Sequence, residues 1–393
     1  MRILYHHRTA SKDGQAVHIE EMIDALRCEG HVVQVVAPGA LRTTDSAPVQ
    51  KSHGQMGEDM GWVHRLKAHL PKAVYELMEC AYSYVAYRKL VTTARAFKPD
   101  VIYERYNLFL LSGLMAKKRL GIPLLLEVNA PLVQERLHHS GGLTLRRLAT
   151  WSEGVVWRGA DRVLPVTHVM ADFVRGRGVP EAHIQVIPNG INRAHFKQAP
   201  ERDEAKAQRG LQDRLVLGFT GFVRDWHGVD RIVDWMATPQ APSCTHLLVV
   251  GDGPVRQALE AQAGRLGLTG RVEFTGVIHR DQVPAHVAAF DVALQPAVTP
   301  YASPLKLMEY LVLGKAIIAP GTPNLREILT HESNALLFDE STPGSLEQAL
   351  TRLCSDADLR ARLALAAVQT IDRLDLTWGG NARRVVTLVE ERP

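Results

Sequence analysis

"SPLKLMEYLVLGKAIIAP", residues 303–320, contains the start and end signals of a helix and a strand directly after it. Ser303 and Pro304 are residue types that begin helices, because the first turn has unpaired N–H groups and a φ that proline already adopts. Gly314 is a typical helix stop, and the apolar run at 316–319 has the character of a buried strand. We therefore expect an apolar, largely buried helix followed by a strand.

The start of this helix also has the chemistry of an anion site. Its unpaired N-terminal amides, with Lys306 beside them, would attract a negatively charged group. Glu309 would lie about a turn and a half deeper and accept hydrogen bonds from a neutral polyol. A purely structural interpretation, in which Glu309 pairs with Lys306 at i,i+3 spacing, is equally compatible with these residues.

Composition limits the class of protein. A chain of 393 residues, 46% hydrophobic and 22% charged, is expected to form two globular domains. It has no apolar run long enough to span a bilayer, and its N-terminus enters a strand without a signal-peptide core, so we expect a cytoplasmic protein. The scattered cysteines argue against a disulfide framework or a zinc ribbon (Cys28, Cys80, Cys244, Cys354).

Charge is distributed unevenly along the chain. Residues 1–195 carry 25 Lys and Arg against 18 Asp and Glu, whereas the remainder carries 21 against 24. This excess suits contact with anionic lipid or an anionic acceptor, but it is too small for a nucleic-acid-binding protein. The aromatic and basic stretch 61–98 predicts peripheral contact with an anionic membrane, the alternative being a helix packed on the first sheet.

Apolar strands alternate with helical stretches in both halves of the chain, which predicts two doubly wound α/β domains. We place them at 1–195 and 196–375, with residues 376–393 forming a helix that packs back on the first domain. Residues 38–61 are expected to be a long mobile loop. The expected strands are Met1–Tyr5, Val32–Ala37, Val101–Tyr103, Pro123–Val128, Val163–Val166, Leu215–Thr220, His246–Val250, Val272–Phe274, Val292–Gln295, Ala316–Ala319 and Ala335–Phe338, with an early helix at Val17–Glu29.

The turn in "LLVVGDGPVRQALE" (247–260) is not a dinucleotide fingerprint, because Arg256 stands where the third glycine is required. Nor does the chain contain a Walker A sequence. Nicotinamide-dependent and ATPase activities therefore lose their main support.

Several segments, in their order and spacing, resemble the family-4 glycosyltransferases of the GT-B fold. They are "HIEEMIDALRCEGHVVQVVAP" (18–38), "VIPNGIN" (186–192), "GFTGFVRDWHGVDRIV" (218–233), "VVGDGPVRQALE" (249–260), "VEFTGVIHRDQVPAHVAAFDVALQP" (272–296) and the 303–320 stretch. The resemblance implies two facing Rossmann-like domains with a cleft between them. It also implies a nucleoside-diphosphate-sugar donor held by the second domain, retention of anomeric configuration, and no essential metal or other cofactor.

The resemblance assigns roles to individual residues. Ser303, Pro304, Leu305 and Lys306 match the helix start that holds the donor diphosphate, and Glu309 matches the acid that binds the ribose hydroxyls. Gly276-Val277 match the backbone that meets the nucleobase. Gly14-Gln15 match the glycine loop that touches phosphate and sugar, and Gly251 and Gly253 are counted with the donor-binding residues.

Arg224 and His227 lie where the family places basic residues on the diphosphate. The commoner family pattern has Arg and Lys at the places of Phe222 and His227, so Arg224 is expected to compensate. His227 would have to act as a neutral donor or be partly protonated near its ordinary pKa of roughly 6.5.

Two departures from the family pattern fall around the transferring sugar. Tyr301 stands where the first acid of the Glu-x7-Glu motif is expected, and Asn129 stands where many members have a sugar-contacting His. Glu127 and Glu135 flank Asn129 and are candidates for a missing carboxylate or for structural residues. We assign the catalytic role to Arg224, Lys306 and Asn129, and count Tyr301 with the donor site.

No metal site is expected. Asp356-Ala-Asp358 resembles a manganese-binding string, but its position at a helix start favours capping, and no His-Glu-x-x-His spacing is present. The sequence thus predicts a retaining glycosyltransferase that uses a hydroxyl acceptor, with a lipid-linked or polysaccharide intermediate as a candidate. The alternatives are another GT-B activity, such as a nucleotide-sugar epimerase, and a non-catalytic nucleotide-sugar-binding partner subunit.

Overall fold

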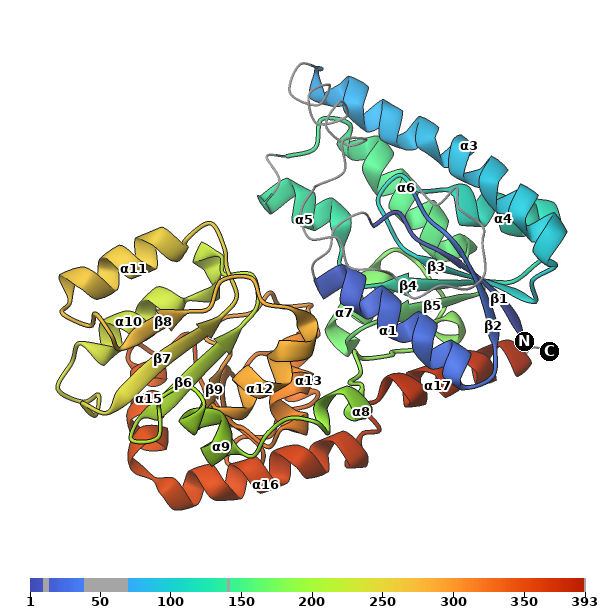
Figure 1. Cartoon of the computed structure of the whole chain (residues 1–393). Helices are drawn as coiled ribbons and strands as arrows, with labels where there is room; N and C mark the ends of the chain where they lie inside the picture. The colour runs from blue at the N-terminus through green and yellow to red at the C-terminus, as the bar shows by residue number, and fades with distance from the viewer. Residues whose placement is uncertain (10–13, 39–69, 140–141, 392–393) are drawn as a thin grey trace.

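The computed structural model describes residues 1–9, 14–38, 70–139 and 142–391. The chain forms two α/β domains that face each other (Figure 1), as the sequence predicts. The loop expected at 38–61 and the first part of the basic stretch, 61–69, lie outside the described residues, except for Pro38.

The first domain is built on a parallel sheet of five strands in the order β2-β1-β3-β4-β5. Ile3 of β1 pairs with Val33 of β2 on one side and with Val101 of β3 on the other. The strands are β1 (Arg2–His6), β2 (Val32–Val36), β3 (Val101–Arg105), β4 (Leu124–Val128) and β5 (Arg162–Pro165).

Helices cover both faces of this sheet, which is why its strands are apolar throughout. Ile3 and Tyr5 of β1 pack on the side of α1, whereas Leu4 packs on the side of α3 and α6. The helices are α1 (Gly14–Cys28), α3 (Lys72–Phe97), α4 (Ser112–Leu120), α5 (Leu132–His139), α6 (Arg146–Gly159) and α7 (His168–Gly176), followed by the short η2 (Glu181–His183) and α8 (Arg193–Phe196).

The second domain has a six-stranded sheet in the order β11-β10-β9-β6-β7-β8, again with every pair parallel. The strands are β6 (Leu215–Thr220), β7 (Thr245–Val250), β8 (Val272–Phe274), β9 (Val292–Leu294), β10 (Ala316–Pro320) and β11 (Leu336–Phe338). The helices are α9 (Arg202–Ala207), η3 (Asp225–His227), α10 (Val229–Met236), α11 (Arg256–Arg265), η4 (Arg280–Gln282), α12 (Val283–Ala288), α13 (Leu305–Val312), α14 (Pro323–Arg326) and α15 (Ser345–Ser355).

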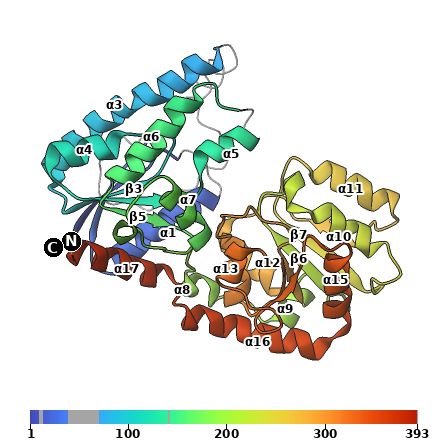
Figure 2. The same ribbon diagram turned by 180° about the vertical axis from the view of Figure 1, so that it is seen from behind.

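The chain ends by crossing back to the first domain. α16 (Ala357–Arg373) runs along the second domain and α17 (Trp378–Glu390) lies against the first (Figure 2). The ring of Trp378 meets the ring of His18 on α1 edge-on, at 4.8 Å between centroids. Asn381 Nδ2 donates a hydrogen bond to Pro188 O at 2.7 Å. The segment from α16 to α17 therefore connects the second domain back to the first.

Most expected strands differ from the observed ones by one or two residues at an end, and two helix starts differ for an identifiable reason. The residue that precedes α13 is Pro304, and Ser303 does not cap the helix because its hydroxyl accepts the N–H of Asn189 in the first domain. α1 begins three residues before the expected Val17, since the apolar periodicity used to place it starts later than the helix itself. The burial expected for α13 is confirmed, because Leu307, Met308 and Leu311 are fully buried.

Gly218 in β6 tests this packing, because a Cβ there would collide with the ring of Phe290 on the neighbouring helical layer. We expect Gly218→Ala to lower the free energy of unfolding by about 1–3 kcal/mol through overpacking. Gly264→Ala is the matched control, since α11 leaves open space there and alanine favours a helix by up to about 1 kcal/mol. Thermal and urea unfolding would measure the stability of both variants. An equal change at the two positions would contradict the close packing of Gly218 against Phe290.

Candidate active site

Two helix N-termini from different domains meet at one point of the molecule. α1 begins at Gly14 and α13 at Leu305, and a Cβ added at Gly14 would lie 3.6 Å from Leu305 Cδ1. Figure 1 shows the two helices facing each other across the domain boundary. Neither has an acidic residue in its first turn, and no side chain caps α13. Their unpaired amides and positive dipole ends therefore face a common region that favours an anion.

A cavity lies on each side of this meeting point, and Gly14 and Leu305 line both. The first has a volume of about 530 Å³ and is also lined by Gln15, His18, Arg105, Asn129, Val166, Asn189, Phe222, Arg224, Trp226, Ala302 and Ser303. The second, of about 310 Å³, is also lined by Val17, Glu21, Gly190, Ile191, Asn192, His195, Phe196, Ile278, Arg280, Val283, Glu309 and Trp378. Both domains contribute to each wall, so the cavities are parts of one interdomain cleft.

Lys306 and Glu309 have separate partners in α13. The Lys306 ammonium lies 3.7 Å from the centroid of the Phe219 ring, at the end of β6. Burial lowers the pKa of Lys306 to about 7, and Glu309 opposes this shift. Glu309 accepts a hydrogen bond from Thr220 Oγ1 at 3.3 Å, and burial raises its pKa. Because each side chain is engaged elsewhere, the arrangement favours the anion-site interpretation over a simple i,i+3 pair.

Contacts between the domains hold the start of α13 in place. Asn189 Nδ2 donates to Ser303 O at 2.5 Å, and the Asn189 N–H donates to Ser303 Oγ at 3.3 Å. Ser303 and Asn189 are both buried. The Ser303 hydroxyl is thereby held toward the first domain, and the amides of the helix remain directed at the cleft.

Arg224 and His227 have different positions. Arg224 lines the first cavity, and its guanidinium lies 5.0 Å from the centroid of the Phe222 ring. His227 is buried behind the cavity wall, where its Nδ1 accepts the N–H of Arg224 at 2.9 Å. Burial, reinforced by the charges of Lys306 and Arg224, lowers the pKa of His227 to about 3. His227 is therefore neutral at physiological pH, and partial protonation is not supported.

Asn129 is held by a buried carboxylate at the end of β4. Its Nδ2 donates to Glu127 Oε1 at 2.5 Å, and Glu127 also accepts from the Tyr103 hydroxyl at 2.8 Å. Arg105 forms an ion pair with Glu127, and His18 Nε2 lies 2.9 Å from its other oxygen. Burial by itself would raise the pKa of Glu127, but His18 and Arg105 hold it well below the ordinary value. Glu127 is thus an ionised positioning residue for groups that face the first cavity.

Four residues assigned to the donor site line neither cavity. Gly251 and Gly253 allow the loop after β7 to pack against the backbone of Gly221 and Val223, where a Cβ would collide with carbonyl oxygens. Val277 is 85% exposed, and the neighbouring Ile278 lines the second cavity instead. Pro304 precedes α13 without lining either cavity.

Tyr301 packs against the first domain instead of lining either cavity. Its ring meets Phe173 of α7 edge-on at 6.4 Å between centroids, and its carbonyl accepts from Thr167 Oγ1 at 3.0 Å. Burial raises the pKa of the Tyr301 hydroxyl to about 12, so this side chain is neutral and does not replace the charge of the family's acid. Its position makes it an interdomain contact.

The residue-by-residue assignment missed several cleft residues. Arg280 of the second domain forms an ion pair with Glu21 of α1, and Asn192 Nδ2 donates to the same carboxylate at 3.1 Å. His18 and Arg105 were also missed. Their signal in the sequence is weak: Arg105 ends a strand, where ligands of open α/β sheets bind, and His18 and Glu21 lie on one helix face.

The structure describes no metal centre: within the described ranges, no three His, Cys, Asp or Glu side chains are placed to hold a metal ion. Asp356 instead begins α16, where its Oδ1 accepts the N–H of Leu359 at 2.8 Å. The capping interpretation of the Asp-x-Asp string is therefore confirmed.

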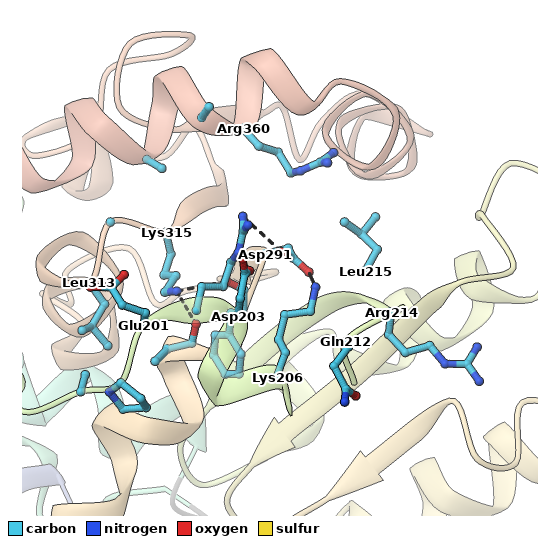
Figure 3. A pocket seen from close by; sticks show the side chains of 18 of the residues that line it. Glu201, Asp203, Lys206, Gln212, Arg214, Leu215, Asp291, Leu313, Lys315 and Arg360 are labelled. Carbon is cyan, nitrogen blue, oxygen red and sulfur yellow. Dashed lines mark hydrogen bonds and ion pairs between the residues drawn. The ribbon is translucent and has the colours of Figure 1, made fainter. Parts of the chain in front are cut away.

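A further cavity, of about 980 Å³, lies at the amino ends of the strands of the second sheet (Figure 3). Residues that precede or begin its strands line it, among them Cys244, Asp291 and Lys315. Its buried charges serve the fold, because Lys206 pairs with Asp291 at 2.9 Å and Lys315 Nζ donates to the carbonyls of Ala288 and Phe290. Ligands of such sheets bind at the carboxyl ends of the strands, so we place the active site in the interdomain cleft.

Comparison with known proteins agrees with this architecture. Residues 13–190 match the family model of the glycosyl transferase 4-like domain, and residues 201–370 match that of glycosyl transferases group 1. The two matches together span both domains. The chain belongs to the family-4 glycosyltransferases of the GT-B fold and is a glycosyltransferase, which favours this activity over an epimerase or a binding subunit.

Individual relatives are distant. The chain is 26% identical over 324 residues to a 2-deoxystreptamine N-acetyl-D-glucosaminyltransferase of Streptomyces fradiae, covering 77% of this chain and 75% of that one. It is 25% identical over 369 residues to a GDP-mannose-dependent alpha-mannosyltransferase of Mycolicibacterium smegmatis, covering 93% and 90%. Among solved structures, Anabaena HepE in complex with UDP superposes with a TM-score of 0.73 at 18% identity over the whole of both chains.

The lowered pKa of Lys306 leads to a prediction about pH. Its ammonium loses its proton as the pH rises through about 7 in the free protein, whereas a bound diphosphate favours the charged form. The affinity for UDP should therefore fall as the pH rises from 7 to 9, by at most about tenfold per pH unit. Calorimetry in buffers of different ionisation enthalpy should detect proton uptake on binding.

Two variants separate the charge of Lys306 from its shape. Lys306→Arg keeps a cation whose pKa lies far above this range, so its UDP affinity should be nearly independent of pH between 7 and 9. Lys306→Met should bind UDP weakly at every pH. A wild-type affinity that is constant across this range would contradict the role assigned to Lys306.

Proposed function

We propose that the chain transfers a hexose-type sugar from a nucleoside-diphosphate sugar to a hydroxyl acceptor, with retention of anomeric configuration. The observation that carries the proposal is the meeting of the N-termini of α1 and α13 between the two cavities. The diphosphate would lie against these amides. Glu309 lines the second cavity, which suits the ribose and base, and the first cavity then accommodates the sugar and the acceptor.

The chemical problem is the charge of the leaving group. Breaking the anomeric bond leaves a nucleoside diphosphate with growing negative charge beside an oxocarbenium-like sugar. The two sets of helix amides, Lys306 and Arg224 would stabilise that charge more in the transition state than in the ground state. Loss of one such donor typically costs about 3–4 kcal/mol of barrier. The proposal assigns this task to protein groups without a metal ion.

Acceptor activation is assigned to the departing phosphate. The carboxylate nearest to Asn129 is Glu127, which is buried and committed to Arg105, His18 and Tyr103, so it is poorly suited to act as a general base. A leaving phosphate oxygen on the same face of the sugar would take the proton from the acceptor hydroxyl, which is consistent with retention. Enclosure of the reacting groups between the domains would limit hydrolysis of the donor.

A panel of UDP- and GDP-sugars would test this function, with nucleotide release measured in the presence and absence of acceptors. Relatives act on 2-deoxystreptamine, so it should be included beside simple glycosides and lipid-linked sugars. We expect release that requires both substrates, persists in EDTA, gives a product with the donor's anomeric configuration, and falls about 100-fold or more in Lys306→Met. An inverted product, or conversion of donor without acceptor, would refute the proposal.

We further propose that the acceptor is lipid-linked or part of a membrane glycoconjugate and that α3 contacts an anionic membrane. Within the described ranges, no helix is both long and apolar enough to cross a bilayer. α3 nevertheless exposes an apolar stripe at helical spacing, formed by Val74, Leu77, Met78, Tyr84 and Val85, each at least 40% exposed. The relative LpsD of Rhizobium meliloti, 30% identical over 238 residues, is named as a lipopolysaccharide core biosynthesis enzyme.

The charges of α3 favour an anionic surface. Its two acidic residues are buried: Glu79 pairs with Arg136 at 2.6 Å, and Glu76 accepts the N–H groups of Thr144 and Leu145. Arg88 and Arg95 are exposed. Other aromatic and basic residues of the stretch are less available to a membrane. Tyr75 and Tyr82 are partly buried, and the Lys89 ammonium donates a hydrogen bond to Ala37 O at 2.6 Å.

Vesicle flotation would test this contact. Wild-type protein should float with vesicles containing about 30% phosphatidylglycerol at low salt, and Leu77→Glu with Val85→Glu should abolish flotation by placing charge in the apolar stripe. Leu365→Glu is the matched control, because Leu365 is 66% exposed on α16 of the other domain. Equal flotation of all three proteins, or none by the wild type, would disprove the contact.

A further inference from the structure

The loop between β6 and α10 presents two aromatic side chains to the cleft. Phe222 is 53% exposed and Trp226 is 44% exposed, and both line the first cavity. Large aromatic rings usually lose most of their accessible surface on folding, because their burial is strongly favourable. Two exposed rings in the wall of a ligand cavity therefore indicate that a ligand covers them.

Both rings are fixed by their neighbours. The Trp226 indole lies 3.9 Å from the buried imidazole of His227, measured between centroids, at an angle of 38°. His227 is itself held by the N–H of Arg224, whose guanidinium approaches the Phe222 ring. Gly221 and Gly228, which adopt positive φ, bound the loop. These contacts restrict the rings, which would reduce the entropic cost of binding a ligand.

The opposite wall of the same cavity is polar and belongs to the first domain. It carries Gln15, His18, Arg105 and Asn129, the last three of which contact the Glu127 carboxylate. A pyranose ring has the matching chemistry. Its axial C–H groups form an apolar face that stacks on the electron-rich face of an aromatic ring, while its hydroxyls at the rim bond to polar side chains.

We propose that Phe222 and Trp226 form a stacking platform for the sugar ring of the acceptor, while the Asn129 side of the cavity binds its hydroxyls. The inference rests on the proposed transferase function and narrows the acceptor to a pyranoside. The rings lie at the exposed rim of the cavity, whereas Ser303, at the start of α13 where the donor diphosphate would lie, is only 7% exposed. The rim is the part of the cleft that an acceptor entering from solvent meets first.

The platform can be tested by binding. With UDP or GDP, whichever binds, at saturation, methyl β-D-glucopyranoside should bind the wild type and show saturation-transfer NMR signals from its ring C–H protons. D-glucitol, which has the hydroxyls but no ring, should bind much more weakly. Trp226→Ala and Phe222→Ala should each weaken pyranoside binding about tenfold, and Trp226→Phe, which keeps a ring, should weaken it less. Trp151→Ala is the matched control, since Trp151 is 53% exposed on α6 and lines neither cavity.

The outcomes separate this inference from the transferase function. If neither UDP nor GDP binds the wild type, the donor site itself is wrong, and the inference that rests on it is overturned as well. If the nucleotide binds but the pyranoside does not, or binds Trp226→Ala as tightly as the wild type, the platform is refuted and the donor site stands. Loss of nucleotide affinity in Trp226→Ala, in parallel with loss of pyranoside affinity, would assign the rings to the donor and also overturn the inference. Thermal unfolding midpoints would verify that the variants are folded.

Discussion

The cleft depends on the unpaired amides of two helices that start in different domains. Each α-helix leaves its first N–H groups without backbone partners, and α1 and α13 direct theirs into the same small region, near Gly14 and Leu305. No carboxylate in either first turn competes for them. An anion placed there has donors on both sides, so the arrangement depends on the relative orientation of the domains and not on either domain alone.

That orientation is maintained by polar contacts around the cleft. Asn189 bonds to Ser303, Arg280 pairs with Glu21, and the carboxylate of Glu327 accepts the first amides of α7 across the boundary. Tyr301 belongs to the same set of contacts. Its packing on Phe173 explains how an aromatic residue can stand where the family has an acid, because here the position serves the junction between domains.

The charges inside the cleft are controlled by burial. Glu127 is kept ionised by His18 and Arg105, and it in turn holds Asn129 at the cavity wall. Lys306 differs from Glu127, because burial disfavours its charged form and lowers its pKa to about 7. An incoming anion would stabilise the protonated form. Substitution of Asn129 for the usual His therefore changes the local chemistry without leaving the position unsupported.

Local sequence patterns were enough to predict the strands and their order along the chain. β6 has the expected bounds, Leu215–Thr220, and the helix and strand of 303–320 follow directly from local apolar patterns and turn residues. Three features could be learned only from the folded chain: Ile278 and not Val277 lines a cavity, His227 is neutral and buried, and Arg280 pairs with Glu21. These facts depend on side-chain direction, desolvation and contacts between domains, which arise when distant segments pack together and which local periodicity does not encode.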